Sequence, residues 1–403
     1  MNSRWPVQLL TVLVLTASQA SARSPEARTT SLGTLGGAGS TAVAINDKGT
    51  VAGFSDTATP NIEHAFIWKN GRMTDLGALG KHESSRAKAI NNNDEIVGDS
   101  FVKGAIHAFL WKKGKMIDLG TLGGKNSFAI GINDRGEVIG NSETSKGKSH
   151  AFLWKEGKMI DLGTLGGASS TAVAINEQGE VAGYSQIKGS GKATHAFIWR
   201  RNRMTDLGAL SRKWPTYASD LNDKGEVIGD GYVSGSRIDG YILKNGRLAD
   251  LGKPASESTS PHSTRTLKIN NRGQIIGGLT YPDGTSWGFF RENGTMTRIK
   301  GVGKASGSTL YDINGKGWTV GSSSIRDEDS TRLDRAFLWC NGNTISLGAE
   351  RGELTQALSI NEAGQVVGWR KEGKRSDNLW QRPSKAVLWK LPEGACEQET
   401  VRR

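Results

Sequence analysis

Short segments in which apolar residues recur with a period of two follow one another along most of the chain. The first four segments span residues 42–46, 50–55, 65–69 and 72–76, and turns rich in Asn and Gly separate them. A period of two is typical of β-strands, and Asn-Gly or Asn-x-x-Gly sequences favour hairpin turns. The pattern predicts four short antiparallel strands and argues against a helical repeat.

This four-strand unit occurs eight times, and an asparagine marks the end of its first strand. The markers, 42–48 residues apart, are Asn46, Asn91, Asn133, Asn176, Asn222, Asn270, Asn314 and Asn361. A glycine of the second strand always lies seven residues after the marker, whereas the number of residues between this glycine and the His64 position of the third strand varies from 8 to 16. One edge of each sheet, the tight face, therefore has turns of fixed length. The opposite edge, the variable face, has loops of variable length.

Units of about 45 residues with four strands are typical of β-propellers, whose blades lie around a central axis. We therefore predict an all-β, eight-bladed β-propeller of four-stranded blades over residues 30–392. Neighbouring blades would cover both sides of each sheet. This arrangement accounts for apolar residues on both sides of one strand, with Phe66 and Trp68 on one side and Ala65 and Ile67 on the other.

The last unit lacks a fourth strand after Trp389. Residues 29–33, Thr-Thr-Ser-Leu-Gly, match residues 116–120 of another fourth strand in register. We expect this N-terminal segment to be the outer strand of blade eight, closing the ring and removing an exposed sheet edge.

Four units contain the sequence His-Ala-Phe-Ile/Leu-Trp, beginning at His64, His107, His150 and His195, with Asp-Leu-Gly-x-Leu-Gly nearby. In these motifs the chain resembles the bacterial HAF-repeat family, a class of predicted extracellular repeat proteins. The resemblance extends over nearly all of residues 30–390. It implies export and a repeat architecture, and it provides no catalytic residues that could be transferred to this chain.

The N-terminus has the pattern of a secretion signal. Arg4 precedes an apolar run over residues 9–17, and Ala20-Ser21-Ala22 fits a signal peptidase site. We therefore expect a signal peptide over residues 1–22, a short linker over 23–29 and a C-terminal tail over 393–403. The mature protein would be secreted, either periplasmic or extracellular. The apolar run is too short for a transmembrane span.

The net charge changes the picture of possible partners. The chain has 52 Lys and Arg against 40 Asp and Glu, and basic residues gather at the turns between the third and fourth strands. These turns contain Lys69, Arg72, Lys112, Lys113, Lys115, Lys155, Lys158, Arg200, Arg201, Arg203, Lys244 and Arg247. One interpretation is protection of the outer strands and solubility. The other is contact with an anionic envelope surface. We expect no nucleic acid partner, because no recognition helix is apparent.

The repeated polar residues indicate structural roles. The four histidines lie on the third strand, about 10 Å out from the innermost strand, so histidines of different blades cannot share one metal ion. The acids Asp75, Asp118, Asp161, Asp206 and Asp250 occur once per blade, and we expect them to bind nearby backbone. Leu-Gly-Gly at Leu35, Leu122 and Leu165 lacks the remainder of a P-loop. We predict no metal and no cofactor.

Ligand-binding residues are expected where the repeat breaks, because loops on a rigid scaffold commonly carry function. The breaks combine aromatic, arginine and carboxylate residues, which suit a glycan or a protein ligand. The candidates are Arg212, Trp214, Tyr217, Tyr281, Asp283, Trp287, Asp327, Asp329, Arg332, Trp369, Arg375, Trp380 and Arg382. Trp287, Arg332, Trp369 and Trp380 are the expected centre. Asp327 and Asp329 lack the full ligand set of a calcium site.

Two functions remain open for a chain that we expect to be monomeric. The first is a secreted, non-catalytic binding or scaffold protein that recognises a cell-envelope glycan or protein through the variable face. The second is a glycan-active hydrolase or lyase with a site on a propeller face or in the channel. The innermost strands repeat Ala-Val-Ala-Ile-Asn or close variants, which predicts a channel wall poor in carboxylates and favours binding.

Only two cysteines are present, Cys340 and Cys396. Cys340 ends the third strand of blade seven, and the C-terminal tail leaves the adjacent blade at the same edge. We therefore predict a Cys340–Cys396 disulfide in an oxidising compartment.

Overall fold

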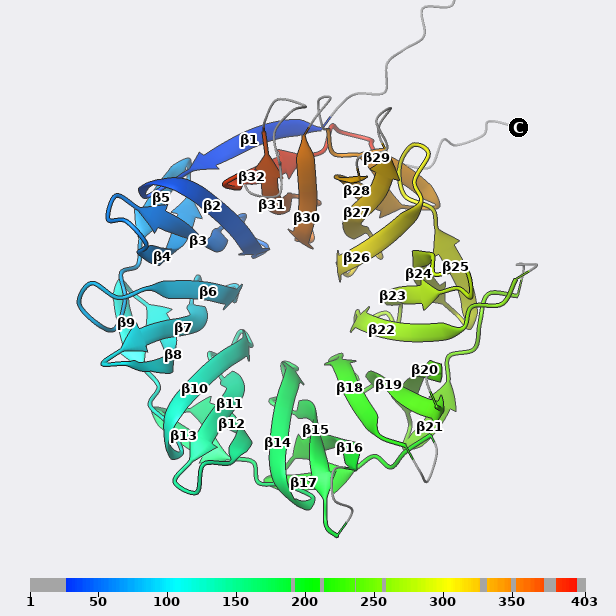
Figure 1. The fold of residues 1–403 in the computed structure, drawn as a ribbon, viewed down its shortest axis with the longest axis horizontal. Helices are drawn as coiled ribbons and strands as arrows, with labels where there is room; N and C mark the ends of the chain where they lie inside the picture. Colours follow the sequence, from blue (N-terminus) through cyan, green and yellow to red (C-terminus); the bar gives the residue numbers. More distant parts are fainter. Residues whose placement is uncertain are drawn as a thin grey trace, which may run out of the picture.

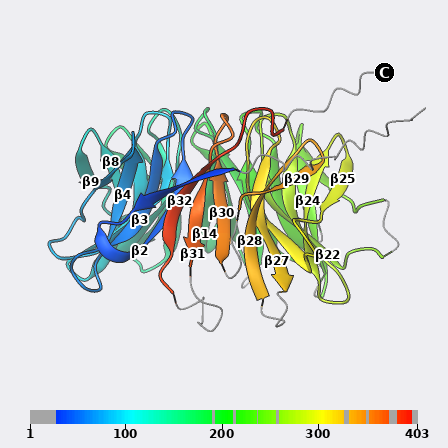
Figure 2. The same cartoon turned by 90° about the horizontal axis from the view of Figure 1, so that it is seen from above.

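The structure, a computed structural model, describes residues 27–189, 193–210, 214–235, 237–255, 259–326, 332–348, 353–372 and 382–396. Eight four-stranded antiparallel sheets lie around a central axis (Figure 1). Seen edge-on, the strands run between the two faces of a short cylinder (Figure 2). The predicted eight-bladed β-propeller is confirmed. In the part of the chain that is described, no helix is long and apolar enough to cross a membrane.

In blades one to seven, the strands follow chain order from the axis outward, and in blade eight the N-terminal strand is outermost. Blades one and two comprise β2 (Gly36–Ile45), β3 (Val51–Thr57), β4 (Glu63–Lys69), β5 (Arg72–Asp75), β6 (Ser85–Ile90), β7 (Ile96–Val102), β8 (Ala105–Lys112) and β9 (Lys115–Asp118). Blades three and four comprise β10 (Gly123–Ile132), β11 (Val138–Thr144), β12 (Ser149–Lys155), β13 (Lys158–Asp161), β14 (Gly166–Ile175), β15 (Val181–Ile187), β16 (Thr194–Arg200) and β17 (Arg203–Asp206).

The second half of the ring has the same order. Blades five and six comprise β18 (Thr216–Leu221), β19 (Val227–Ser234), β20 (Arg237–Lys244), β21 (Arg247–Asp250), β22 (Ser263–Ile269), β23 (Ile275–Thr280), β24 (Ser286–Glu292) and β25 (Thr295–Ile299). Blades seven and eight comprise β26 (Gly307–Ile313), β27 (Thr319–Arg326), β28 (Arg332–Cys340), β29 (Asn343–Ser346), β30 (Leu354–Ile360), β31 (Val366–Lys371), β32 (Lys385–Lys390) and β1 (Arg28–Gly33).

The N-terminal strand closes the ring. β1 pairs antiparallel with β32, with Thr30 opposite Leu388 and Ser31 opposite Val387. In Figure 1 it lies outside β32, where the other blades have their own fourth strand. The predicted closure is confirmed. The strand begins at Arg28, so residues 28 and 29 belong to the blade and not to the linker predicted over residues 23–29.

The core consists of layers between blades. Phe66 is fully buried and packs with Val51 and Leu388 between blades one and eight. Ala65 packs on the other side of the same strand, in the cluster between blades one and two. The burial of Phe66 requires glycine on the second strand. A Cβ on Gly53 would lie 2.6 Å from the Phe66 ring and 2.1 Å from the Thr41 carbonyl oxygen. Each blade therefore buries apolar residues on both sides, as predicted.

The eight marker asparagines form a closed hydrogen-bonded circle, the Asn ring. Each side-chain Nδ2 donates to the backbone oxygen of the next marker, at 2.9–3.2 Å, and Asn361 donates to Asn46 at 3.0 Å. Each Oδ1 accepts the amide proton four residues later, and in blades one to seven it also accepts the one two residues later, as Asn133 does from Glu137 and Arg135. Every marker therefore holds its own turn and the neighbouring blade.

The Leu-Gly-Gly segments extend inner strands. β2 begins at Gly36, six residues earlier than the strand predicted from residue 42, and β10 and β14 begin at equivalent glycines. A Cβ on Gly37 would lie 2.5 Å from the Asp56 side chain and from the Thr57 carbonyl oxygen. Only glycine allows this close approach of two strands. The motif has a packing role.

Cys340 and Cys396 form a disulfide, with Cα atoms 5.7 Å apart. Cys340 is the last residue of β28 in blade seven, and Cys396 follows blade eight. The Asn341 side chain also donates a hydrogen bond to the Cys396 carbonyl oxygen at 2.6 Å. The disulfide and this hydrogen bond thereby attach the segment that follows blade eight to blade seven.

Deletion of residues 23–35 should open the ring. The deletion removes β1, leaves the edge of β32 unpaired and exposes Leu388, which packs against Leu32. We expect a lower melting temperature and self-association, measured by thermal unfolding and size-exclusion chromatography. A truncated protein that stayed monomeric with an unchanged melting temperature would show that the closure does not stabilise the ring.

Loss of the disulfide should destabilise blade eight. Its two cysteines are separated by 56 residues, and the chain-entropy model gives about 4 kcal/mol for a loop of that length. The Cys340→Ser, Cys396→Ser double variant should therefore unfold at lower denaturant concentration than the oxidised protein. Reductant should lower the midpoint of the wild type and leave that of the double variant unchanged. Equal midpoints for all samples would contradict the expectation.

Candidate functional site

The tight-face end of the channel is acidic. The residue after each marker forms a second circle, in which carboxylates and amides accept backbone N–H groups of neighbouring blades. Its members are Asp47, Asn92, Asp134, Glu177, Asp223, Asn271, Gly315 and Glu362. Several of them line a cavity of about 250 Å³. Burial, together with repulsion from Asp134 and Asp223, raises the pKa of Glu177.

The middle of the channel carries charge on one side only. Asp220, Lys268 and Asp312 lie at the same position of the inner strands in blades five, six and seven, where blades one to four have Ala or Gly. Lys268 reaches solvent although protein surrounds it, and attraction to Asp220 raises the pKa of its ammonium group. The expectation of a wall poor in carboxylates is therefore wrong for blades five and seven.

The two wall carboxylates join blades. Asp220 accepts the backbone N–H of Ile269 at 2.9 Å, and Asp312 accepts that of Ile360 at 3.0 Å. Burial raises the pKa of both carboxyl groups. Each inner strand has a register shift beside this position. A bulge of this kind redirects side chains, which explains why the repeat pattern did not reveal the wall residues.

Toward the variable face, a different set of residues surrounds the axis, which we call the axial ring. In each blade, one residue of the inner strand is paired with the residue that follows the second-strand glycine. The eight pairs are Thr41 and Phe54, Arg86 and Asp99, Phe128 and Asn141, Thr171 and Tyr184, Tyr217 and Asp230, Arg265 and Gly278, Thr309 and Ser322, and Gln356 and Trp369.

Aromatic and charged side chains contact one another in the axial ring. The Arg86 guanidinium lies 4.8 Å from the centre of the Phe54 ring, across the junction of two blades. Tyr184 and Tyr217 meet edge to face across another junction, with ring centres 5.1 Å apart. Phe128 is 36% exposed, although it is a large apolar residue. These contacts hold aromatic surfaces in place beside polar groups.

Two carboxyl groups of the axial ring are partly desolvated. Asp230 accepts hydrogen bonds from the Thr266 N–H at 2.7 Å and from its hydroxyl at 3.0 Å, and burial raises the pKa of Asp230 to about 6. Burial also raises the pKa of Asp99, although Lys88 forms an ion pair with it. Both acids also bind the next blade, since Asp99 accepts the Ala129 N–H at 3.1 Å.

The repeated histidines and acids have the structural role that the sequence predicted. In blades one to four, the histidine Nδ1 lies 2.9–3.0 Å from both carboxylate oxygens of the acid eleven residues later. In the first pair, Asp75 also accepts the Gly77 N–H at 2.7 Å. Within the described residues, no group of three or more His, Cys, Asp or Glu side chains could hold a metal ion.

Part of the basic arc on the tight face is neutralised. Lys112 pairs with Glu95 at 3.2 Å, and Lys155 pairs with Glu137 at 3.0 Å, within their own blades. Burial alone would raise the pKa of Glu137, but hydrogen bonds from Asn133, Arg135 and Lys155 hold it below its usual value. Contact of these turns with an anionic surface remains a prediction, now resting on exposed residues such as Lys113 and Lys115.

The predicted ligand residues separate into groups. Tyr217 and Trp369 belong to the axial ring, and the Lys371 ammonium lies 5.5 Å from the centre of the Trp369 ring. Arg382 is exposed and lines a cavity of about 230 Å³ between blades eight and one, with Lys371 and Asp56. Trp214 is half-buried beside blade five.

The candidates of blade six lie farther from the axis. Tyr281 is only 6% exposed and packs in the core between blades five and six, so its ring does not form the predicted ligand surface. Trp287 is half-buried on the third strand, and Asp283 is exposed but accepts two hydrogen bonds from Thr285 within its own turn. Trp287 and Trp369 therefore do not belong to one continuous site.

Several candidates lie outside the described residues: Arg212, Asp327, Asp329, Arg375 and Trp380. Arg332 begins β28, and its side chain is outside the description. The signal peptide predicted over residues 1–22 is also outside it. These predictions stay predictions.

Most residues of the axial ring were not predicted from the sequence, because the predicted ligand residues lie in loops and at breaks of the repeat. Alignment of the eight units does, however, indicate where the axial ring lies. The second-strand glycine recurs in every unit, whereas the next residue is Phe, Asp, Asn, Tyr, Asp, Gly, Ser or Trp. In a repeat held by packing, a position that varies this widely beside a fixed one is free of the packing constraint.

Comparisons with known proteins support the fold alone. No family model and no curated protein matches the chain. The β-propeller domain of the Trilobed protease from Pyrococcus furiosus, described as having an open velcro topology, is similar at 12% identity over 78% of this chain and 97% of that chain, with a TM-score of 0.50. A prolyl endopeptidase structure is similar at 11% identity over 85% of this chain and 56% of its own, with a TM-score of 0.52. The chain thus spans a little over half of that peptidase.

The Asp230→Asn variant should change the pH dependence of stability. Because the folded-state pKa of about 6 exceeds the ordinary 3.8, the folded protein binds more protons between these values. The contribution of Asp230 to the free energy of unfolding therefore decreases, by up to about 3 kcal/mol, as the pH rises from 4 to 7. Urea unfolding at both pH values should show a smaller decrease in the variant than in the wild type.

Asp283→Asn provides the control of opposite sign. Hydrogen bonds from Thr285 lower the pKa of this exposed carboxyl group, so its stabilisation is lost as pH falls. An identical pH dependence of wild type and Asp230→Asn would contradict the assignment of the high pKa to Asp230.

Proposed function

We propose that the protein is a secreted, non-catalytic binding protein that holds a cell-envelope glycan against the axial ring on the variable face. The observation that supports this proposal is the variation of the axial ring within a repeated frame. Aromatic residues occupy five of its sixteen positions, namely Phe54, Phe128, Tyr184, Tyr217 and Trp369. All are at least partly accessible to solvent.

The chemistry of the axial ring suits a glycan. Sugar rings have apolar C–H faces that stack on aromatic rings, while their hydroxyl groups need donors and acceptors at the edges. Aromatic residues here alternate with Arg86, Asp99, Asn141 and Arg265, whose side chains supply both. A stable protein interface commonly has a contiguous apolar centre with charge at its rim. Interleaved charges favour the glycan over a protein ligand.

The roles of the wall carboxylates favour binding over catalysis. In a hydrolase or lyase, Asp220 and Asp312 in the middle of the channel would be the candidates for the general acid and base. Each of them accepts a backbone N–H of the next blade, which accounts for its presence without substrate. Residues 1–22 and the resemblance to the HAF-repeat family support secretion.

An array of bacterial envelope polysaccharides should identify bound glycans, and turnover assays on these glycans should detect no cleavage. Tyr217→Ala and Trp369→Ala should each weaken binding at least about tenfold, because aromatic hot spots contribute about 2 kcal/mol or more. Affinity can be measured by calorimetry, with thermal unfolding to verify the fold.

The matched control lies on the opposite face. Lys113→Glu with Lys115→Glu reverses two exposed charges on a tight-face turn, and it should leave glycan affinity unchanged at low and high salt. Loss of affinity confined to this lysine pair would place the principal site on the tight face. Absence of any bound glycan, or turnover of a bound one, would also contradict the proposal.

A further inference from the structure

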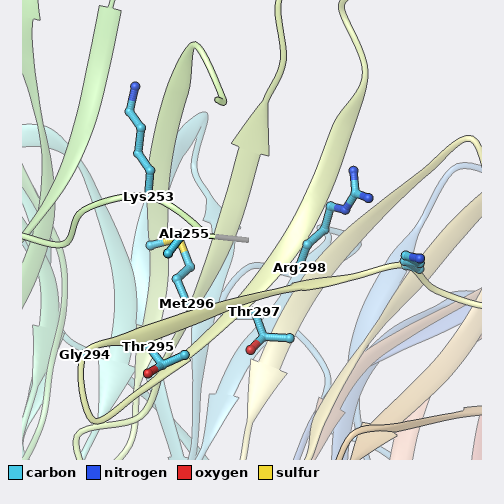
Figure 3. A pocket seen from close by; sticks show the side chains of 8 residues that line it. Lys253, Ala255, Gly294, Thr295, Met296, Thr297 and Arg298 are labelled. Carbon is cyan, nitrogen blue, oxygen red and sulfur yellow. The ribbon is translucent and has the colours of Figure 1, made fainter. Parts of the chain in front are cut away.

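A second candidate site lies on the outside of blade six, far along the sheet from the axial ring. A groove of about 500 Å³ runs beside β25 and the segment that leaves blade five. We call it the blade-six groove, and it is lined by Lys253, Ala255, Gly294, Thr295, Met296, Thr297, Arg298 and Lys300. These lining residues include three cations and no carboxylate. Figure 3 shows Lys253 and Arg298 extending in the same direction from separate segments.

The central cation replaces an acid of the repeat. Arg298 is paired with Phe289 in blade six, as Asp75 is paired with Phe66 in blade one. Trp287, two residues before Phe289, correspondingly occupies the histidine position. Blade six therefore has an arginine stacked on a tryptophan where blades one to four have a histidine bound to an aspartate. The local charge changes from negative to positive.

The two lysines are also departures from the repeat. Lys300 follows Ile299 at the position where blades one to five have a glycine after leucine. Lys253 follows Gly252, where blades one to four have alanine or threonine. Three independent replacements thus add positive charge, and the fold brings all three to one groove.

The groove also holds its arginine in a defined position. The Arg298 guanidinium carbon lies 5.3 Å from the centre of the Trp287 ring and 5.7 Å from that of Tyr281. Tyr281 is buried in the core, so it provides a fixed support. The Lys253 ammonium donates to the Pro261 carbonyl oxygen at 2.8 Å, which restrains a second cation. Stacking of this kind fixes the plane of a guanidinium, which is the group that matches oxyanion geometry.

We infer that the blade-six groove binds phosphate ester groups. A planar guanidinium and two ammonium groups match the charge of a phosphate, and both kinds of group donate hydrogen bonds to its oxygens. The inference goes beyond the proposed glycan site, because none of these residues belongs to the axial ring. The phosphate can belong to a soluble polymer or to a lipid headgroup, which share this chemistry.

The test uses tripolyphosphate as a soluble probe and phosphatidylglycerol vesicles as a membrane probe. The informative variant combines Trp287→His with Arg298→Asp, which restores the residue pair of blades one to four and therefore a contact that this fold accommodates. Calorimetry should show at least about tenfold weaker tripolyphosphate binding, as expected for loss of a charge-assisted hydrogen bond. Lys300→Glu, at an exposed residue, should weaken binding without affecting thermal unfolding.

Lys146→Asp is the matched control for net charge. It makes the same charge change on an exposed turn of blade three, outside both the groove and the basic turns of the tight face, and should alter affinity less than twofold. Binding of either probe that is lost in the blade-six variants supports the inference, and vesicle sedimentation identifies a lipid source. Failure of the wild type to bind either probe would overturn it. So would equal weakening by Lys146→Asp, or full affinity in the restored variant.

Discussion

The rest of the structure depends on the circle of asparagine side chains at the tight face. Each amide joins a turn of its own blade to the backbone of the next, and these asparagines are buried at 3–7% exposure. A buried amide that lost its partners would cost about 1–3 kcal/mol for each group left unsatisfied. The first turn of every blade must therefore keep one length and one conformation. The circle also joins the last blade to the first, because Asn361 donates to Asn46 across the closure of the ring.

Because the turns at the tight face are fixed, the identity of the residue can vary only at certain positions of each blade. Between sheets, small residues such as Gly53 must accommodate large ones such as Phe66, which leaves little freedom there. The residue next to that glycine faces the region near the axis and varies widely. Function in such a ring is therefore expected at the positions beside the invariant ones, and not only in long loops.

The sequence predicted the strands, the number of blades and the closing strand, because these depend on period and register, which a repeat displays eight times. It predicted the His64 to Asp75 contact only as a structural role. Tyr281 was placed wrongly, since a position after a strand does not reveal whether a ring turns inward. Asp220 was overlooked because its partner Ile269 comes from the next blade, and Arg298 because Trp287 and Tyr281 come from other segments of blade six. A single strand carries no information about either set of neighbours.

The closing strand also determines when the fold can be completed. Residues 28–33 precede all other strands of the ring in the chain, yet their partners are residues 385–390, so almost the whole chain must exist before the last sheet forms. Contacts of such large sequence separation are slow to form, because the entropy of closing the intervening chain opposes them. In an unfinished chain, residues 28–33 therefore lack their strand partner. Under the proposed secretion, the chain would pass through a translocation pore before its ring is closed.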